Sequence, residues 1–168
     1  MEMRLSIVTP VTLRSVGAGD EVFMLELYAS TRADEMALVN WTPDQKEAFL
    51  QTQSTAQLKH YRMNYPKAQY QIIERDGTPI GRLIVDRSEN PILLMDIALL
   101  PDYQRSGIGT TLIQDLMAEA AGKNWSVRLH VETFNPAMRL YSRLGFVKSG
   151  EMGIYYEMMW HPTGQLEC

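Results

Sequence analysis

The stretch QRSGIG, residues 104–109, stands between an apolar run at residues 92–100 and a helical pattern at residues 110–121. A strand, a glycine-containing turn and a helix start together form a backbone site for anions, because successive amide N–H groups converge where the helix dipole is positive. Glycine at positions 107 and 109 removes the Cβ atoms that would keep phosphate oxygens away from the backbone. The stretch therefore predicts a site for a phosphate or pyrophosphate group.

The bulk composition is that of one soluble globular domain. The chain has 168 residues, of which 45% are hydrophobic and 21% are charged. We expect a single domain over residues 1–168, with residues 1–10 as an N-terminal extension and 161–168 as a tail. The net charge of -4 and the lack of a Lys/Arg run argue against a nucleic-acid partner.

Several absent signals narrow the setting. No apolar run approaches the roughly 20 residues needed to span a membrane, so no membrane partner is expected. The start of the chain has no apolar h-region, and the single cysteine, Cys168, has no partner for a disulfide. We therefore expect a cytoplasmic protein. The three histidines, at positions 60, 130 and 161, are too scattered to predict a metal site.

The order of expected elements predicts an α/β protein. Asp20 is expected to cap a first helix, and Thr42 to Gln45 match a capping box with proline at the first helical position. Asp76-Gly77 predicts a hairpin turn. The pattern favours three layers, with helices on both faces of one mixed, largely antiparallel sheet of six to seven strands. The expected strands are residues 11–15, 69–75, 80–87, 92–100, 127–132, 146–147 and 154–160; the later helices are residues 43–65, 107–121 and 136–144.

Two helices carry specific packing predictions. In the helix from Gly107, an apolar face repeats at helical spacing and is expected to lie against the sheet. It consists of Ile108, Leu112, Ile113, Leu116 and Ala120. The more polar helix 43–65 is expected at an edge, with Phe49, Ala56 and Tyr61 touching the body.

Two motifs make the interpretation of the glycine turn specific. Residues 96–109, DIALLPDYQRSGIG, resemble motif A of the GNAT superfamily of N-acetyltransferases, with its Q/R-x-x-G-x-G/A core intact. About twenty-five residues further on, NPAMRLYSRLGF at 135–146 resembles motif B of the same superfamily. The resemblance covers at least residues 69–160.

The resemblance implies the GNAT fold, in which two central strands splay apart, and acetyl-CoA as the co-substrate without a metal. The amides from Gln104 to Thr110 would hold the pyrophosphate, and the edge of the strand near Leu99 would pair with the pantetheine arm. A backbone N–H near Ala98 or Leu99 would polarise the thioester carbonyl. The implied cofactor-binding residues are Ala98, Leu99, Leu100, Gln104, Arg105, Ser106, Gly107, Ile108, Gly109, Thr110, Asn135 and Tyr141.

The resemblance also implies direct attack by a neutral amine, followed by expulsion of CoA thiolate. Tyr141 is the expected general acid, since a phenol with a pKa of about 10 can protonate a thiolate whose conjugate acid has a pKa of about 8.5. The alternative is that Tyr141 is only a core aromatic.

Four origins of the general base stay open. His130 lies on the strand beside the cleft, and histidine exchanges protons near neutral pH. Asp96 is an ionisable group in an otherwise apolar strand, where it could bind the substrate ammonium or pair with an arginine. Glu132 shares the face of His130, and water could also carry the proton.

The acceptor pocket is expected from the first two helices, their loop and the final hairpin. An aromatic and acidic mixture would suit an ammonium group through cation–π contacts and ion pairing. The candidates are Tyr28, Arg32, Glu35, Trp41 and Tyr155, with Tyr61, Tyr65 and Tyr156 nearby in the same segments.

Three functions remain open on the sequence. The first is an N-acetyltransferase that acts on a primary amine of a small molecule or peptide. The second is a transferase of a longer acyl group. The third is a GNAT-like module that binds acyl-CoA as a sensor without turnover, because a fold does not establish a function. A homodimer through the closing hairpin is expected only by analogy with the superfamily.

Overall fold

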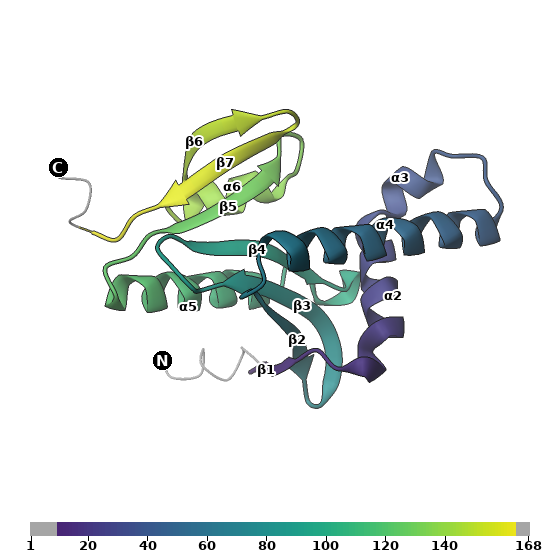
Figure 1. Cartoon of the computed structure of the whole chain (residues 1–168), viewed down its shortest axis with the longest axis horizontal. Coiled ribbons are helices and arrows are strands. Elements are labelled where there is room, and N and C mark those ends of the chain that lie inside the picture. Colours follow the sequence, from purple (N-terminus) through teal and green to yellow (C-terminus); the bar gives the residue numbers. More distant parts are fainter. Residues whose placement is uncertain (1–9, 164–168) are drawn as a thin grey trace.

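The computed structural model describes residues 10–163, which form one seven-stranded sheet with helices on both faces (Figure 1). The strand order is β1-β2-β3-β4-β5-β7-β6. The predicted fold class is therefore confirmed. The strands are β1 Thr12–Ser15, β2 Gln69–Arg75, β3 Thr78–Asp86, β4 Ile92–Leu99, β5 Val127–Glu132, β6 Val147–Met152 and β7 Tyr155–Trp160.

The helices follow the predicted order, with three short additions. Helix α3 follows α2 directly, and the 3-10 helices η1 and η2 precede α2 and α5. The capping box opens α4 as predicted: the Thr42 N–H donates to Gln45 Oε1 and the Gln45 N–H to Thr42 Oγ1. The helices are η1 Ala18–Asp20, α2 Glu21–Thr31, α3 Ala33–Ala37, α4 Pro43–Asn64, η2 Pro101–Tyr103, α5 Ile108–Gly122 and α6 Ala137–Arg143.

The parting of β4 and β5 shapes the centre of the sheet. These two strands are parallel, and their pairing runs only from Ile92↔Val127 to Leu94↔Leu129. On the other side, β4 stays paired with β3 up to Gly81↔Leu99, with an irregularity beside Met95. The sheet therefore opens after Leu94 and leaves one edge of β4 without a strand partner, as the splayed arrangement predicts.

The two faces of the sheet carry different helices. Ile73, Leu83 and Leu129 lie in the apolar core with the predicted inner face of α5, and side chains of α6 pack against the same core. The opposite face, which includes Arg82 and Asp96, is covered by α2 and α4. Figure 1 shows α4 lying across the sheet, with its first turns and α3 reaching beyond it.

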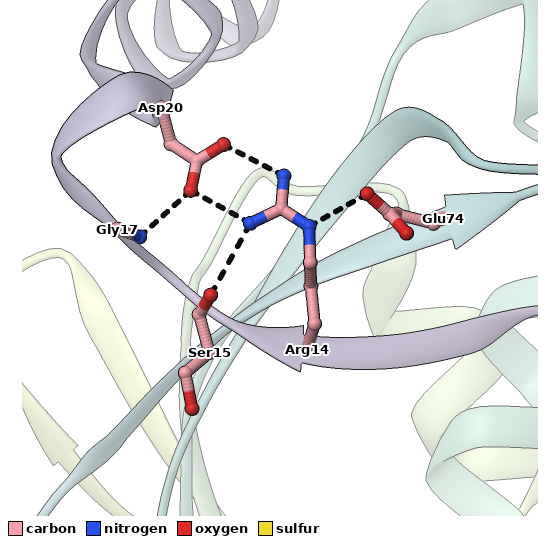
Figure 2. Close-up of polar contacts among 5 residues, drawn as sticks. All are labelled: Arg14, Ser15, Gly17, Asp20 and Glu74. Atoms are coloured by element: carbon pink, nitrogen blue, oxygen red, sulfur yellow. Dashed lines mark hydrogen bonds and ion pairs between the residues drawn. The ribbon is translucent and has the colours of Figure 1, made fainter.

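Arg14 of β1 ties the start of α2 to the sheet (Figure 2). Its Nη1 and Nη2 each donate to the Asp20 carboxylate at 2.8 Å, and its Nε donates to Glu74 Oε2 of β2 at 2.6 Å. Asp20 also accepts from the Gly17 N–H at 2.7 Å. Asp20 occupies the predicted N-cap position of α2, but its carboxylate serves Arg14 and Gly17 and caps no amide of α2. The first helix is thereby held against the β1–β2 edge.

The packed face of α4 differs from the predicted one. Phe49 is partly exposed and packs on Trp41, and Ala56 is exposed, so of the three predicted contacts only Tyr61 faces the body. The buried positions are Leu50 and Ser54, and Gln57 follows on the same side of the helix, where it accepts from Arg82 of the sheet. Ser54 and Gln57 are polar, and this face of α4 covers the side of the sheet that carries Arg82 and Asp96. The apolar residues of α4 therefore did not mark its packed face. Between residues 10 and 163, no helix is long and apolar enough to cross a membrane.

Candidate active site

The glycine turn has the backbone geometry of an anion site. Gly107 adopts φ +88°, a left-handed conformation that favours glycine, and precedes the first residue of α5. Arg105 is also left-handed, at φ 60°. The first amides of α5 have no helical acceptor and point out of the helix start. A Cβ built on Gly107 or Gly109 meets no heavy atom within 4 Å among the described residues beyond its chain neighbours and its own helix backbone, so both glycines border open space.

The open edge of β4 presents main-chain groups beside this turn. The Leu100 N–H donates to Ile80 O of β3 at 2.8 Å. Because successive residues of a strand point their N–H and C=O groups to opposite edges, those of Leu99 face the open side. The Leu99 carbonyl accepts there from Gln104 Nε2 at 2.9 Å. The Leu99 N–H is therefore better placed than that of Ala98 to meet a ligand in the opening.

Tyr141 reaches the opening from α6. It lines a cavity of about 180 Å³ between the parted strands, and its ring lies edge-on to Phe146 with 6.0 Å between ring centroids. Burial, together with the negative charge of Asp96, raises the pKa of Tyr141 to about 12. The phenol is thus held in its protonated form, as a general acid requires.

Asp96 lies on the wall of the same cavity and is paired with a buried arginine. Arg82 Nε donates to Asp96 Oδ2 at 2.5 Å, and Arg82 Nη2 donates to Gln57 Oε1 of α4 at 2.9 Å. The Arg82 side chain is 4% exposed and that of Asp96 is 23% exposed. Pairing with an arginine was one of the alternatives for Asp96, and it is the one that the structure displays. A carboxylate engaged in this way is a weaker candidate for the general base.

His130 lines the cavity from β5, opposite Asp96. Its Nε2 lies 3.7 Å from Glu157 Oε2 of β7. Glu132 lines the cavity two residues further along and lies 3.9 Å from Arg32 Nη1. The structure thus brings three candidate proton acceptors to one opening.

A second cavity of about 200 Å³ continues from the first toward α2 and β3. Tyr28, Arg32 and Ala98 lie on its wall. Burial opposes the charge of Arg32, but hydrogen bonding with Tyr28 and Glu35 outweighs burial and raises the pKa of the guanidinium. Arg32 Nη1 donates to Glu35 Oε1 at 3.1 Å, which connects Glu35 to the site through Arg32.

Not every candidate is gathered at the opening. Tyr61 and Tyr155 line the first cavity, and burial raises the pKa of Tyr61 with a further contribution from Asp96. Trp41 instead packs on Phe49, with ring centroids 5.2 Å apart and 41% of the residue exposed. Tyr65 caps the end of α4, and the ring of Tyr156 packs on the core beneath Lys148. These last three residues line neither cavity.

Asn135 lies on the walls of both cavities, at the start of α6. Its Oδ1 accepts from the Ala137 N–H at 2.8 Å, which fixes the entry into the helix that carries Tyr141. The structure therefore gives Asn135 a local role, and its contact with a cofactor stays a prediction.

Sequence reasoning missed Arg82 and Gln57. A signal for Arg82 exists, because it is the one charged residue within the run 79–85 and Asp96 is the one charged residue within the run 91–101. Opposite charges in neighbouring apolar strands predict a pair. Gln57 carries no comparable signal in a helix rich in polar residues.

Residues 66–148 match the family described as Acetyltransferase (GNAT) domain. The mouse cysteine-rich protein 2-binding protein is 33% identical over 88 residues, which are 52% of this chain and 11% of that protein. A Bacillus subtilis protein named as a ribosomal protein bS18-alanine N-acetyltransferase is 28% identical over 100 residues, which are 58% of this chain and 66% of that protein.

A solved structure shares the fold of this chain. The structure of a PaiA N-acetyltransferase from Thermoplasma acidophilum in complex with coenzyme A superposes with a TM-score of 0.69 at 18% identity, covering 90% of this chain and 99% of that one. The fold, the two motifs and these matches together place the chain in the GNAT superfamily. The chain spans about a tenth of the length of its mammalian relative, and membership of the family does not by itself give this chain the activities of its relatives.

Proposed function

We propose that this protein is an N-acetyltransferase that transfers the acetyl group of acetyl-CoA to a primary amine within a ternary complex. The observation that carries the proposal is the convergence of three features on one opening of the sheet. They are the anion turn before α5, the free edge of β4 at Leu99 and the protonated phenol of Tyr141. A CoA-binding module without turnover would need the first two features but not the third.

Acetyl-CoA, when bound, supplies an activated acetyl group as a thioester. The amides at the start of α5 bind the pyrophosphate, and the Leu99 main chain pairs with the pantetheine arm. The Leu99 N–H then stabilises the negative charge that develops on the carbonyl oxygen. With these contacts, the reacting carbon would lie in the opening that Tyr141 lines.

The side chains transfer two protons. As the amine nitrogen bonds to the acetyl carbon, the C–S bond breaks and Tyr141 donates its proton to the departing sulfur. The proton lost by the amine passes to His130, which faces the same cavity with Glu157 behind it. The products are an N-acetyl amine and the CoA thiol, and the proton taken up by His130 replaces the one that Tyr141 donated, so no net proton is released. His130 is preferred to Asp96 because Asp96 is already held by Arg82.

The test is to incubate the protein with acetyl-CoA and a panel of primary amines, including short peptides, while following free CoA thiol. Propionyl-CoA and succinyl-CoA serve as alternative donors. Amine-dependent thiol release with acetyl-CoA as the best donor is the expected result. Tight binding of acetyl-CoA without release would favour the sensor function, and a faster reaction with a longer donor would favour another acyltransferase.

A further inference from the structure

The two cavities of the active site share one wall but differ in the side chains beyond it. Their shared wall includes Arg32, Asp96 and Glu132. The cavity between the parted strands adds the groups that would handle protons, His130 and Tyr141. The cavity toward α2 and β3 adds Arg82. One end of an acceptor is therefore expected at the proton-handling groups and the other end beside the arginine.

Arg82 has hydrogen-bonding capacity that the protein does not use. Its Nε and Nη2 donate to Asp96 and Gln57, but Nη1 is buried and has no hydrogen-bond partner within residues 10–163. A buried donor without an acceptor costs free energy, and more when the group is charged. A guanidinium that pays this cost on the wall of a cavity is suited to receive a ligand oxygen.

Arg32 supplies a second guanidinium to the same cavity. Its side chain is 28% exposed, and its Nη1 is shared between Glu35 at 3.1 Å and Glu132 at 3.9 Å. The guanidinium of Arg32 also lies over the ring of Tyr28 in a cation–π contact, with Arg32 Cζ 5.3 Å from the ring centroid. Arg32 is thereby held at the mouth while Arg82 lies deeper. Two guanidinium groups on one small cavity favour an anionic group on the ligand.

The carboxylates on the shared wall complete the charge pattern. Asp96 and Glu132 would repel a simple anion and attract an ammonium group. A simple amine would satisfy these carboxylates but leave Arg82 Nη1 without a partner among the described residues. A ligand with both charges, an ammonium toward the parted strands and an anion toward β3, is complementary to all four side chains.

From this arrangement we infer that the acceptor is an amino acid, whose amine lies near His130 and Tyr141 and whose carboxylate binds beside Arg82 and Arg32. This inference rests on the proposed function, because it names the substrate class of the same site. A carboxylate fits a guanidinium better than an amide carbonyl does, since both of its oxygens accept charge-assisted hydrogen bonds. A free amino acid is therefore favoured over the N-terminus of a peptide.

The experiment measures thiol release from acetyl-CoA with each of the twenty common amino acids, its amide and its decarboxylated amine. At least one amino acid should have a kcat/KM at least tenfold above those of its amide and its decarboxylated amine. Equal rates within a series, or faster reaction of the amides, would overturn the inference and leave the proposed function standing. If neither these compounds nor the peptides caused thiol release, that result would instead contradict the proposed function itself.

A variant then tests the role of Arg82. Arg82→Lys keeps a cation beside Asp96 but removes the fork that carries Nη1. It should lower kcat/KM for the preferred amino acid at least tenfold, mainly through KM, and change that for the decarboxylated amine less than threefold. Arg87→Lys is the matched control, because Arg87 pairs with Glu119 of α5 outside both cavities. Unchanged discrimination in folded Arg82→Lys protein would remove Arg82 from the site.

Discussion

Arg82 and Asp96 join neighbouring strands through a 2.5 Å hydrogen bond between Arg82 Nε and Asp96 Oδ2, on the face of the sheet that α4 covers. Gln57 of α4 accepts from the same guanidinium. The pair therefore links β3, β4 and α4 at the point where β4 leaves β5. It forms part of the wall of the proposed acceptor site and keeps the charged guanidinium of Arg82 buried.

Asp96→Asn should lower the stability of the fold. Without the carboxylate, the guanidinium of Arg82 stays buried without a countercharge, which we expect to cost about 2 kcal/mol because Asp96 is partly exposed. Thermal unfolding should shift down by about 4–8 °C. The exposed Asp115→Asn on α5 is the control, with an expected change below about 0.5 kcal/mol. Equal unfolding temperatures for the two variants would show that the pair contributes nothing to stability.

Tyr141→Phe should reduce turnover by roughly a hundredfold while leaving the affinity for acetyl-CoA within about twofold, because it removes only the donated proton. Steady-state kinetics and calorimetric binding check the two parts. Tyr70→Phe is the control, since its hydroxyl is buried without a hydrogen-bond partner in the described structure and lies outside both cavities. Normal turnover in the Tyr141 variant would exclude the phenol from the chemistry.

The same phenol predicts a pH profile. A general acid loses activity as pH rises through its pKa, and burial with the charge of Asp96 raises that pKa to about 12. Tyr141 should therefore cause no loss of kcat up to about pH 10.

Gly107→Ala should impair both stability and CoA binding. Alanine at φ +88° costs about 1 kcal/mol or more, and straightening the turn would move the amides at the start of α5. We expect CoA affinity to fall at least tenfold in a calorimetric titration. Gly109→Ala also adds a methyl group in open space, but inside the first helical turn, where alanine is favoured. It should unfold at the same or a higher temperature and bind CoA more tightly than Gly107→Ala does.

Asp20 predicts an acid-dependent contribution to stability. Hydrogen bonds from Arg14, and then from the Gly17 backbone, lower the pKa of Asp20 from 3.8 to about 2. A depressed pKa stabilises the fold above the ordinary value, and this stabilisation is lost as pH falls through the folded value. Asp20→Asn should therefore unfold a few degrees below the parent at pH 7, and the difference should fade between about pH 4 and pH 2. Asp34→Asn, an exposed control, should show no such pH-dependent difference.

Much of the fold could be predicted because its elements carry strong periodic signals. The buried face of α5, from Ile108 to Ala120, repeats at helical spacing, and the turn at Asp76-Gly77 adopts the expected positive φ values of 52° and 78°. The strand β6 was predicted only at 146–147, whereas it runs over 147–152. Its residues are mostly exposed at the edge of the sheet, so no alternation marks them.

The glycine turn of the candidate site was easier to predict than the contacts of the proposed acceptor side. The turn depends on consecutive residues, which the sequence displays directly. The acceptor side depends on contacts between distant segments, such as Arg82 with Gln57, separated by 25 positions. Trp41 illustrates the same difficulty: it lies in the expected loop, but its aromatic partner Phe49 holds it away from the cavities.

The parting of β4 and β5 also divides the molecule mechanically. Three paired positions, from Ile92↔Val127 to Leu94↔Leu129, join a four-stranded half of the sheet to the half made of β5, β7 and β6. The Leu99 edge belongs to the first half, whereas Tyr141 packs against Phe146 beside the second. A donor molecule bound between them would contact both halves of the sheet and restrain their relative motion. Slower amide hydrogen exchange along β4 and β5 in the presence of the donor would measure this restraint.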